Sequence, residues 1–115
     1  MPQSIYPRPS KDIARRRREL APDPYEAFGR FSAAVFADGA LTGRTKQLIA
    51  VAVADATQCP YCIRGHTTAA LREGATEAGL MEAIGVAAEM QAGAAYAHST
   101  LAVDTAAHAH GPRAA

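Results

Sequence analysis

The chain has 115 residues and a net charge of +1, which gives no general argument for a nucleic-acid partner. Hydrophobic residues make up 49% and charged residues 20%, a balance typical of a globular protein and not of a disordered one. No apolar run reaches the roughly 18 residues that a membrane span needs. The first 20 residues are broken by prolines and charges and lack a signal-peptide core. We therefore expect a single cytoplasmic domain, residues 1–115, that binds neither membrane nor nucleic acid.

The N-terminal region predicts an extended arm followed by a short helix. Residues 1–9 contain three prolines, and Ser10 is a good N-cap for a helix that extends to about Leu20. This helix carries the run Arg15 to Arg18, which we interpret as a solvated face, with contact to nucleic acid or another anionic partner as the alternative.

A second helix is predicted to begin at Asp23 as N-cap with Pro24 at the first helical position, and to stop at Gly39. Its large side chains recur at helical spacing, which indicates core packing and not a cofactor site. They are Tyr25, Phe28, Phe31, Val35 and Phe36.

The third predicted helix is the most apolar part of the chain. Thr42 is a suitable N-cap for a helix from Gly43 to Thr57. The segment Leu48 to Ala54 is apolar on every side, which predicts a buried helix, and its alanine content disfavours a strand.

Two more helices complete an all-α fold of about five helices. One runs from Pro60 to Glu73 and ends at Gly74; the other is capped by Thr76, extends from Glu77 to about Ala107 and is followed by a frayed tail at residues 108–115.

Three glycines interrupt the last helix, at Gly79, Gly85 and Gly93. Each costs of order 1 kcal/mol relative to alanine, and close helix–helix approach is the expected compensation. This helix also has more small apolar surface than a monomer of this length easily buries, so the sequence predicts an oligomer.

The two cysteines of the chain carry its most specific chemical signal. Cys59 and Cys62 are separated by Pro60 and Tyr61, and His66 follows four residues after Cys62. In a helix Cys62 and His66 share one face, so the imidazole can deprotonate the thiol, while Cys59 lies at the helix N-terminus, where a thiolate is favoured. After an oxidant converts Cys62 to a sulfenic acid, Cys59 can condense with it to a disulfide.

Less specific interpretations of these residues remain open. The cysteines could be a buried structural pair, and His66 could be an ordinary helix histidine. They could be half of a zinc site, although no second cysteine pair exists, and we expect no metal and no cofactor. The tetrapeptide Cys-Pro-Tyr-Cys also occurs in glutaredoxins, but here it follows an apolar helix and no Thr-Val-Pro loop occurs later in the chain.

The segment Gly39 to Ala54, followed by Thr57-Gln-Cys-Pro-Tyr-Cys62 and His66, resembles the carboxymuconolactone decarboxylase family and its alkyl hydroperoxidase D-like branch. The resemblance covers about Phe28 to Ala97. It implies an all-helical homo-trimer or homo-hexamer.

In the peroxidase members of that family the second cysteine attacks the peroxide and the first resolves it. The resemblance therefore implies that Cys62 attacks, that Cys59 resolves and meets the reductant, and that His66 is the partner in proton transfer. The substrate would be a small hydroperoxide, and the reductant a lipoyl- or thioredoxin-like dithiol protein.

Two positions depart from the peroxidase motif. Gln47 stands twelve residues before Cys59, where the motif has a glutamate that begins the proton relay. An amide can orient His66 or a water but cannot accept a proton; the alternative is a polar residue at the exposed start of a buried helix. Asp55 could supply a carboxylate instead, although a solvent-facing or capping residue is the simpler expectation. Tyr61 replaces a histidine that the motif can carry.

The sequence therefore predicts a thiol-dependent peroxidase or disulfide reductase. The alternatives are a decarboxylase-type enzyme acting on a carboxylactone, which needs no cysteine pair, and a non-enzymatic helical oligomer that senses oxidation or binds metal.

Overall fold

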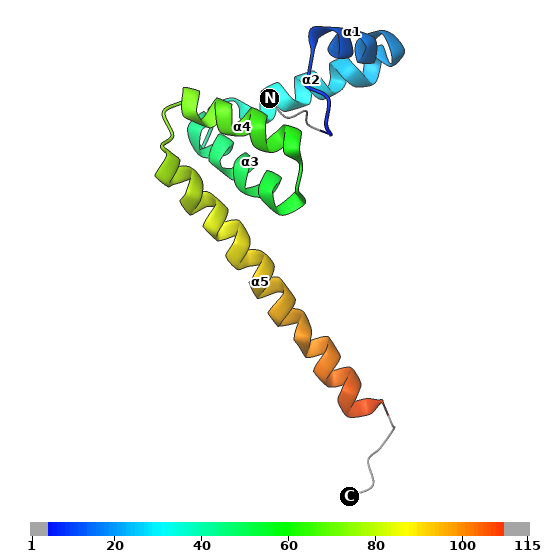
Figure 1. Cartoon of the computed structure of the whole chain (residues 1–115), viewed down its shortest axis with the longest axis vertical. Coiled ribbons are helices and arrows are strands. Elements are labelled where there is room, and N and C mark those ends of the chain that lie inside the picture. The colour runs from blue at the N-terminus through cyan, green and yellow to red at the C-terminus, as the bar shows by residue number, and fades with distance from the viewer. Residues whose placement is uncertain (1–4, 110–115) are drawn as a thin grey trace, which may run out of the picture. The chain divides into compact units, whose positions relative to one another are not determined.

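The computed structural model describes residues 5–109, and in this range it contains five α-helices and no β-strand (Figure 1). The all-α prediction is therefore confirmed. Contacts divide the chain into two units, one up to Lys46 and one from Gln47 onward, and each is described by itself.

The first unit begins with α1 (Lys11–Leu20), whose start was predicted correctly. The Ser10 hydroxyl accepts a hydrogen bond from the Ile13 N–H at 3.2 Å and so satisfies one of the unpaired donors of the first turn. Arg15 pairs with Asp12 at 3.0 Å on the exposed surface. The run Arg15 to Arg18 is exposed throughout, as expected for a solvated face.

The next helix, α2 (Pro22–Phe36), begins two residues earlier than predicted. Pro22 and not Pro24 stands at its first position, because Ala21 already has the non-helical backbone of an N-cap. The helix ends at Phe36, and Gly39 is not its stop. The chain turns at Ala37, which has extended backbone angles, and the Asp38 carboxylate accepts the Gly43 N–H at 2.6 Å.

The prediction that the large side chains of α2 form a core is wrong for the single chain. Phe28 and Phe31 are 71% and 64% exposed, and their rings lie against each other with centroids 6.4 Å apart. Tyr25 and Phe36 are half-buried. Helical spacing identified an apolar face, but this face has no cover within the first unit.

The third helix, α3 (Gly43–Thr57), has the predicted bounds. Thr42 caps it, since its hydroxyl accepts the Thr45 N–H at 3.2 Å. Its apolar centre is buried on one side only: Val51 is 1% exposed, whereas Val53 is 55% exposed. The prediction of a fully buried helix therefore holds for one face of α3 and is wrong for the opposite one.

The fourth helix, α4 (Pro60–Arg72), also matches its predicted position. It ends at Arg72, and the chain then turns at Gly74, whose φ of 96° is the left-handed conformation that glycine adopts most readily. The Ala75 N–H donates to the Ala70 carbonyl at 2.9 Å and the Gly74 N–H to the Leu71 carbonyl at 3.1 Å, which is a Schellman motif.

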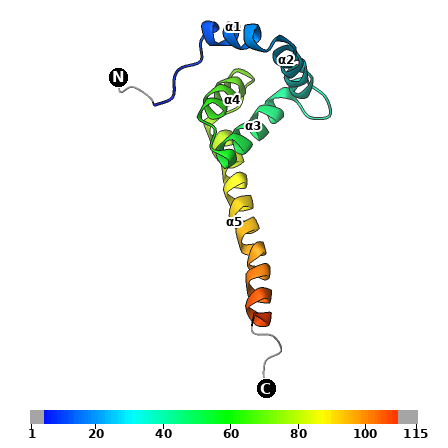
Figure 2. The same ribbon diagram turned by 90° about the vertical axis from the view of Figure 1, so that its right-hand side faces the viewer.

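The last helix, α5 (Glu77–His108), is 32 residues long and begins at the predicted cap, where the Thr76 hydroxyl accepts the Gly79 N–H at 3.0 Å. Figures 1 and 2 both show its first turns beside α3 and α4 and the rest extending beyond them. The core of this second unit joins all three helices. Its buried residues are Val51, Ala70 and Leu80, and the half-buried Leu48, Ala75 and Ile84 pack against them.

Two expectations about α5 are corrected. Gly85 has no atom within 4 Å of where a Cβ would lie, and a Cβ at Gly93 would meet only Glu89 of the same helix. Neither glycine therefore lies where another helix of this chain packs closely against α5. The helix includes His108, which was assigned to the frayed tail. The remainder of that tail from residue 110, like residues 1–4 of the arm, lies outside the described residues.

None of the described helices combines the length and apolarity that crossing a membrane requires.

Candidate redox site

Cys59 is placed by the sharp connection between α3 and α4. The Cys59 N–H donates to the Ala54 carbonyl at 3.1 Å and the Gln58 N–H to the Asp55 carbonyl at 3.3 Å, a second Schellman motif. The next residue, Pro60, begins α4, so only Gln58 and Cys59 lie between the two helices. Cys59 is therefore the N-cap of α4 only two residues after α3 ends.

The two cysteines lie at the first turn of α4 and form a disulfide, with Cα atoms 5.2 Å apart. The Cys59 Sγ also accepts a hydrogen bond from the Cys62 N–H at 3.2 Å. This is the position that a serine or aspartate oxygen occupies in an ordinary N-cap. Cys59 is half-buried and Cys62 is exposed.

His66 lies one turn after Cys62 and contacts α3 through Gln47. The His66 Nδ1 and the Gln47 Oε1 are 2.8 Å apart, across 19 residues of sequence. Since the amide oxygen can only accept, Nδ1 carries the proton, and in the neutral ring Nε2 then bears the lone pair. This bond orients the ring and favours the tautomer with the proton on Nδ1.

Gln47 is 8% exposed, the one buried polar side chain among the described residues. The interpretation as an exposed polar residue at the helix start is therefore wrong. A buried amide requires a hydrogen-bond partner, and His66 provides it. The same bond would also satisfy a purely structural histidine, so the contact defines how the ring is oriented and leaves its chemical role to experiment.

Asp55 was expected to face solvent or to cap a helix, and the structure differs from this for one of its oxygens. The residue is half-buried, and its Oδ2 atom is buried without a hydrogen-bond partner among the described residues. A carboxylate oxygen in this condition is unusual and costs stability unless a water or a proton satisfies it. The prediction of a solvent-facing side chain is therefore wrong for this oxygen.

Gln58 is a residue whose importance sequence reasoning missed. Its φ of 58° is the only positive value of a non-glycine residue in the described range. A side chain in this conformation is strained by roughly 1–2 kcal/mol. The signal was present in the sequence, since a helix that ends at Thr57 and restarts at Pro60 leaves room only for a sharp turn.

The described residues contain no group of three or more histidine, cysteine, aspartate or glutamate side chains placed to hold a metal ion.

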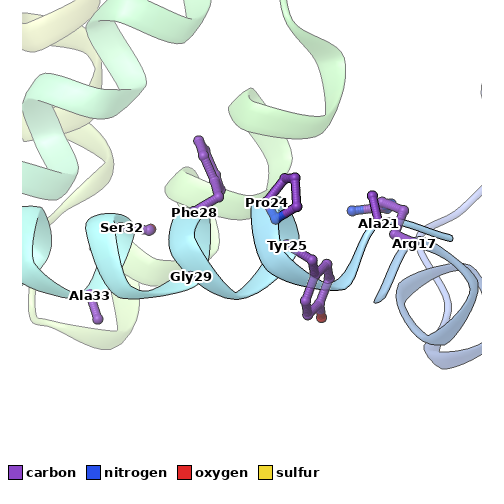
Figure 3. A pocket seen from close by; sticks show the side chains of 8 residues that line it. All are labelled: Arg17, Ala21, Pro24, Tyr25, Phe28, Gly29, Ser32 and Ala33. Atoms are coloured by element: carbon purple, nitrogen blue, oxygen red, sulfur yellow. The ribbon is translucent and has the colours of Figure 1, made fainter. Parts of the chain in front are cut away.

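A separate open groove lies in the first unit, on α2 and the end of α1. Figure 3 shows its lining side chains, which are mostly apolar with one guanidinium. They are Arg17, Ala21, Pro24, Tyr25, Phe28, Gly29, Ser32 and Ala33. This lining contains no thiol, imidazole or carboxylate side chain.

Comparison with known proteins decides the family. The model of the carboxymuconolactone decarboxylase family matches residues 22–105, which include α2 to α4, most of α5 and all residues of the redox site. The chain belongs to the carboxymuconolactone decarboxylase family. The resemblance inferred from the sequence motif is thus confirmed, and its alkyl hydroperoxidase D-like branch fits this family.

Two relatives that are both named as uncharacterized proteins are similar in sequence. A Paracoccus denitrificans protein, known as uncharacterized protein 4 in the cox locus, is 67% identical over 78 residues, which cover 68% of this chain and 70% of the relative. An uncharacterized Cupriavidus necator protein is 39% identical over 86 residues, covering 73% of this chain and 76% of its own length.

Two solved structures share the fold. A protein from Methanobacterium thermoautotrophicum is 42% identical with a TM-score of 0.69, covering 72% of this chain and 93% of its own. A carboxymuconolactone decarboxylase family protein from Legionella pneumophila, solved in its apo form, is 38% identical with a TM-score of 0.63, covering 70% of this chain and 74% of its own.

Proposed function

We propose that this protein is a thiol-dependent oxidoreductase that reduces small hydroperoxides with Cys62 and Cys59. The observation that carries the proposal is the pairing of a disulfide-forming CxxC at the start of α4 with His66, whose ring is oriented by the buried Gln47. Family membership supports the fold in which such a pair operates.

The reaction begins with the reduced pair. His66 Nε2 takes the proton of the Cys62 thiol, directly or through one water, and the Cys62 thiolate attacks the terminal oxygen of the hydroperoxide. The O–O bond breaks, the alkoxide leaves as an alcohol after protonation, and Cys62 becomes a sulfenic acid. The Cys59 sulfur then attacks Cys62, so that the disulfide forms and water leaves. A lipoyl- or thioredoxin-like dithiol protein reduces the disulfide and closes the cycle.

Gln47 has a positioning role in this scheme. Its Oε1 holds the imidazole through Nδ1, but an amide cannot accept the proton that His66 collects. The proton must therefore return to the leaving alkoxide or pass to solvent, and peroxide reduction is expected to be slower than with a carboxylate at this position.

The decarboxylase alternative suggested by the family name assigns no task to a cysteine pair. Nor does it explain why a half-buried sulfur caps α4 and an exposed one follows a turn later. Turnover of a carboxylactone that survives both Cys59→Ser and Cys62→Ser would support it against our proposal.

We further propose that the protein acts as a homo-oligomer, a trimer or a hexamer. Beyond its first two turns α5 has exposed apolar residues along its whole length, and α3 exposes apolar residues opposite its core face. Exposed apolar surface on this scale is typical of a subunit interface. The residues are Ile49, Val53, Val86, Met90, Tyr96, Leu101 and Val103.

The direct test is peroxide-dependent oxidation of a dithiol such as dihydrolipoamide. We expect wild type to turn over and Cys62→Ser to be inactive, because the remaining thiol, Cys59, is half-buried and has no second thiol with which to form a disulfide. Cys59→Ser should undergo a single oxidation to the sulfenic acid without turnover. Full activity in Cys62→Ser would eliminate the proposed function.

A further inference from the structure

The two sulfurs of the redox site lie in different surroundings. Cys59 is half-buried where α3 meets α4, and Cys62 is exposed one turn into α4. A thiolate attacks a disulfide in line, from the far side of the sulfur with which it bonds. A protein reductant therefore needs open space beyond the attacked sulfur, and Cys62 is the more exposed of the two residues.

The leaving sulfur is distinguished by a second, independent feature. When the disulfide breaks, the departing sulfur carries the negative charge. Cys59 Sγ already accepts the Cys62 N–H at 3.2 Å and lies at the N-terminus of a helix of 13 residues. Both the N–H and the helix dipole stabilise a negative charge there. A better stabilised thiolate leaves faster, so the same geometry favours Cys59 as the leaving group.

We infer that the dithiol reductant attacks Cys62, and that Cys59 leaves as a thiolate held by the N-cap hydrogen bond. This inference rests on the proposed thiol–disulfide function. It reverses the expectation from the sequence that Cys59 meets the reductant, because the sequence alone does not show that Cys62 is the more exposed residue.

The exchange takes place in two balanced steps. The first reductant thiolate bonds to Cys62 Sγ, the Cys59–Cys62 bond breaks, and its electron pair goes to Cys59. The second thiolate of the reductant then attacks the reductant sulfur that is bonded to Cys62. The bond to Cys62 breaks, and the Cys62 sulfur leaves and takes up a proton. The reductant loses two electrons and two protons and becomes a disulfide, while the cysteine pair gains them.

This assignment gives each cysteine one role in both half-reactions. Cys62 forms every bond to an outside molecule, first to peroxide oxygen and later to the reductant sulfur. Cys59 bonds only to Cys62, as the attacking sulfur that closes the disulfide and as the leaving sulfur that opens it.

A trapping experiment tests the inference on the oxidised wild-type protein. The probe is a thioredoxin whose second active-site cysteine is replaced by serine, so that its mixed disulfide cannot resolve. After rapid acid quenching and alkylation, fragment mass spectrometry identifies which cysteine carries the probe. We expect Cys62 to carry it at least about tenfold more often than Cys59, a ratio equal to roughly 1.4 kcal/mol in the barrier. Trapping mainly on Cys59, or on neither cysteine, would overturn the inference.

A pair of matched variants separates exposure from leaving-group stability. Cys59→Ser and Cys62→Ser are each converted to the mixed disulfide with thionitrobenzoate, which gives both the same leaving group. The probe should then release thionitrobenzoate faster from Cys62 than from Cys59. Equal or reversed rates would overturn the exposure argument.

This test is independent of peroxide. If wild type traps the probe on Cys62 but fails to reduce any hydroperoxide, the inference stands and the proposed peroxidase function fails.

Discussion

The two ends of α5 differ in what surrounds them. At its N-terminal end Leu80 is 8% exposed and packs with Val51 and Ala70 in the core of the second unit, whereas Leu101 near the other end is 64% exposed. The same residue type on one helix is thus a core residue in one place and surface in the other. The comparison teaches that the core which supports the redox site is small, and that most of α5 is available for contacts between chains.

The largest expected effect comes from truncating these two leucines. Leu80→Ala should lower the free energy of unfolding by about 2–5 kcal/mol, because it leaves a cavity between α3, α4 and α5. Leu101→Ala should cost less, and its cost should depend on protein concentration, because in the proposed oligomer Leu101 contacts another chain. Denaturant unfolding at two concentrations, with light scattering for molar mass, measures both.

Equal losses for Leu80→Ala and Leu101→Ala at every concentration would contradict the division of α5 into a core end and an assembly end. A wild-type protein that is monomeric by light scattering would contradict the assembly proposal itself.

The second prediction concerns the residue that joins α3 to the site. Gln47→Glu places a proton acceptor beside His66 Nδ1, and we expect the rate of hydroperoxide reduction to rise about tenfold or more, within the range of general acid–base effects. Gln47→Leu is the control, since it removes the acceptor and should lower the rate below wild type. Steady-state assays of all three proteins check this order.

An unchanged rate in Gln47→Glu would mean that the proton leaves His66 by another route. Asp55, with its buried and unpartnered Oδ2, would then be the next residue to change.

The smallest expected changes in stability concern the C-terminal ends of α3 and α4, which share the Schellman hydrogen-bond pattern. Gly74 occupies its left-handed position without a side chain, whereas Gln58 occupies the equivalent position before Cys59 with one. Gly74→Ala should therefore lower the free energy of unfolding by about 1 kcal/mol, and Gln58→Gly should raise it by up to about 1 kcal/mol. Thermal or denaturant unfolding measures the two opposite signs.

If Gln58→Gly is instead destabilising, the strain assigned to the turn that places Cys59 is absent.

The helices were largely predictable because their starts are chemically marked. Ser10, Thr42 and Thr76 each accept an N–H of the first turn, as their sequence positions indicate. The start of α2 was not predicted correctly, because Ala21 has no capping side chain and both Pro22 and Pro24 suit the first helical position.

Burial was predicted less well, for a physical reason. Periodicity shows which face of a helix is apolar, but it does not distinguish a face covered by the same chain from one left for another chain. Phe28 and Val53 are therefore exposed although their spacing is that of core residues.

In the redox site the sequence placed Cys59 at the N-cap and Cys62 and His66 on one face, because helix geometry dictates those relations. It offered the contact between Gln47 and His66 only as one alternative, since that contact spans 19 residues and depends on how α3 packs against α4. The short gap between Thr57 and Pro60 implied a sharp turn, but the positive φ of Gln58 was not inferred from it. The unequal exposure of Cys59 and Cys62 emerged only from the structure.

The central claim is that Cys59 and Cys62 form a working dithiol, and a thiol count tests it most directly. The reduced chain has two cysteines, and one equivalent of a small hydroperoxide should remove both thiols, which a dithiol should then restore. Cys62→Ser should keep its single thiol under the same conditions. A wild-type protein that retains two thiols after exposure to hydroperoxide would contradict the account.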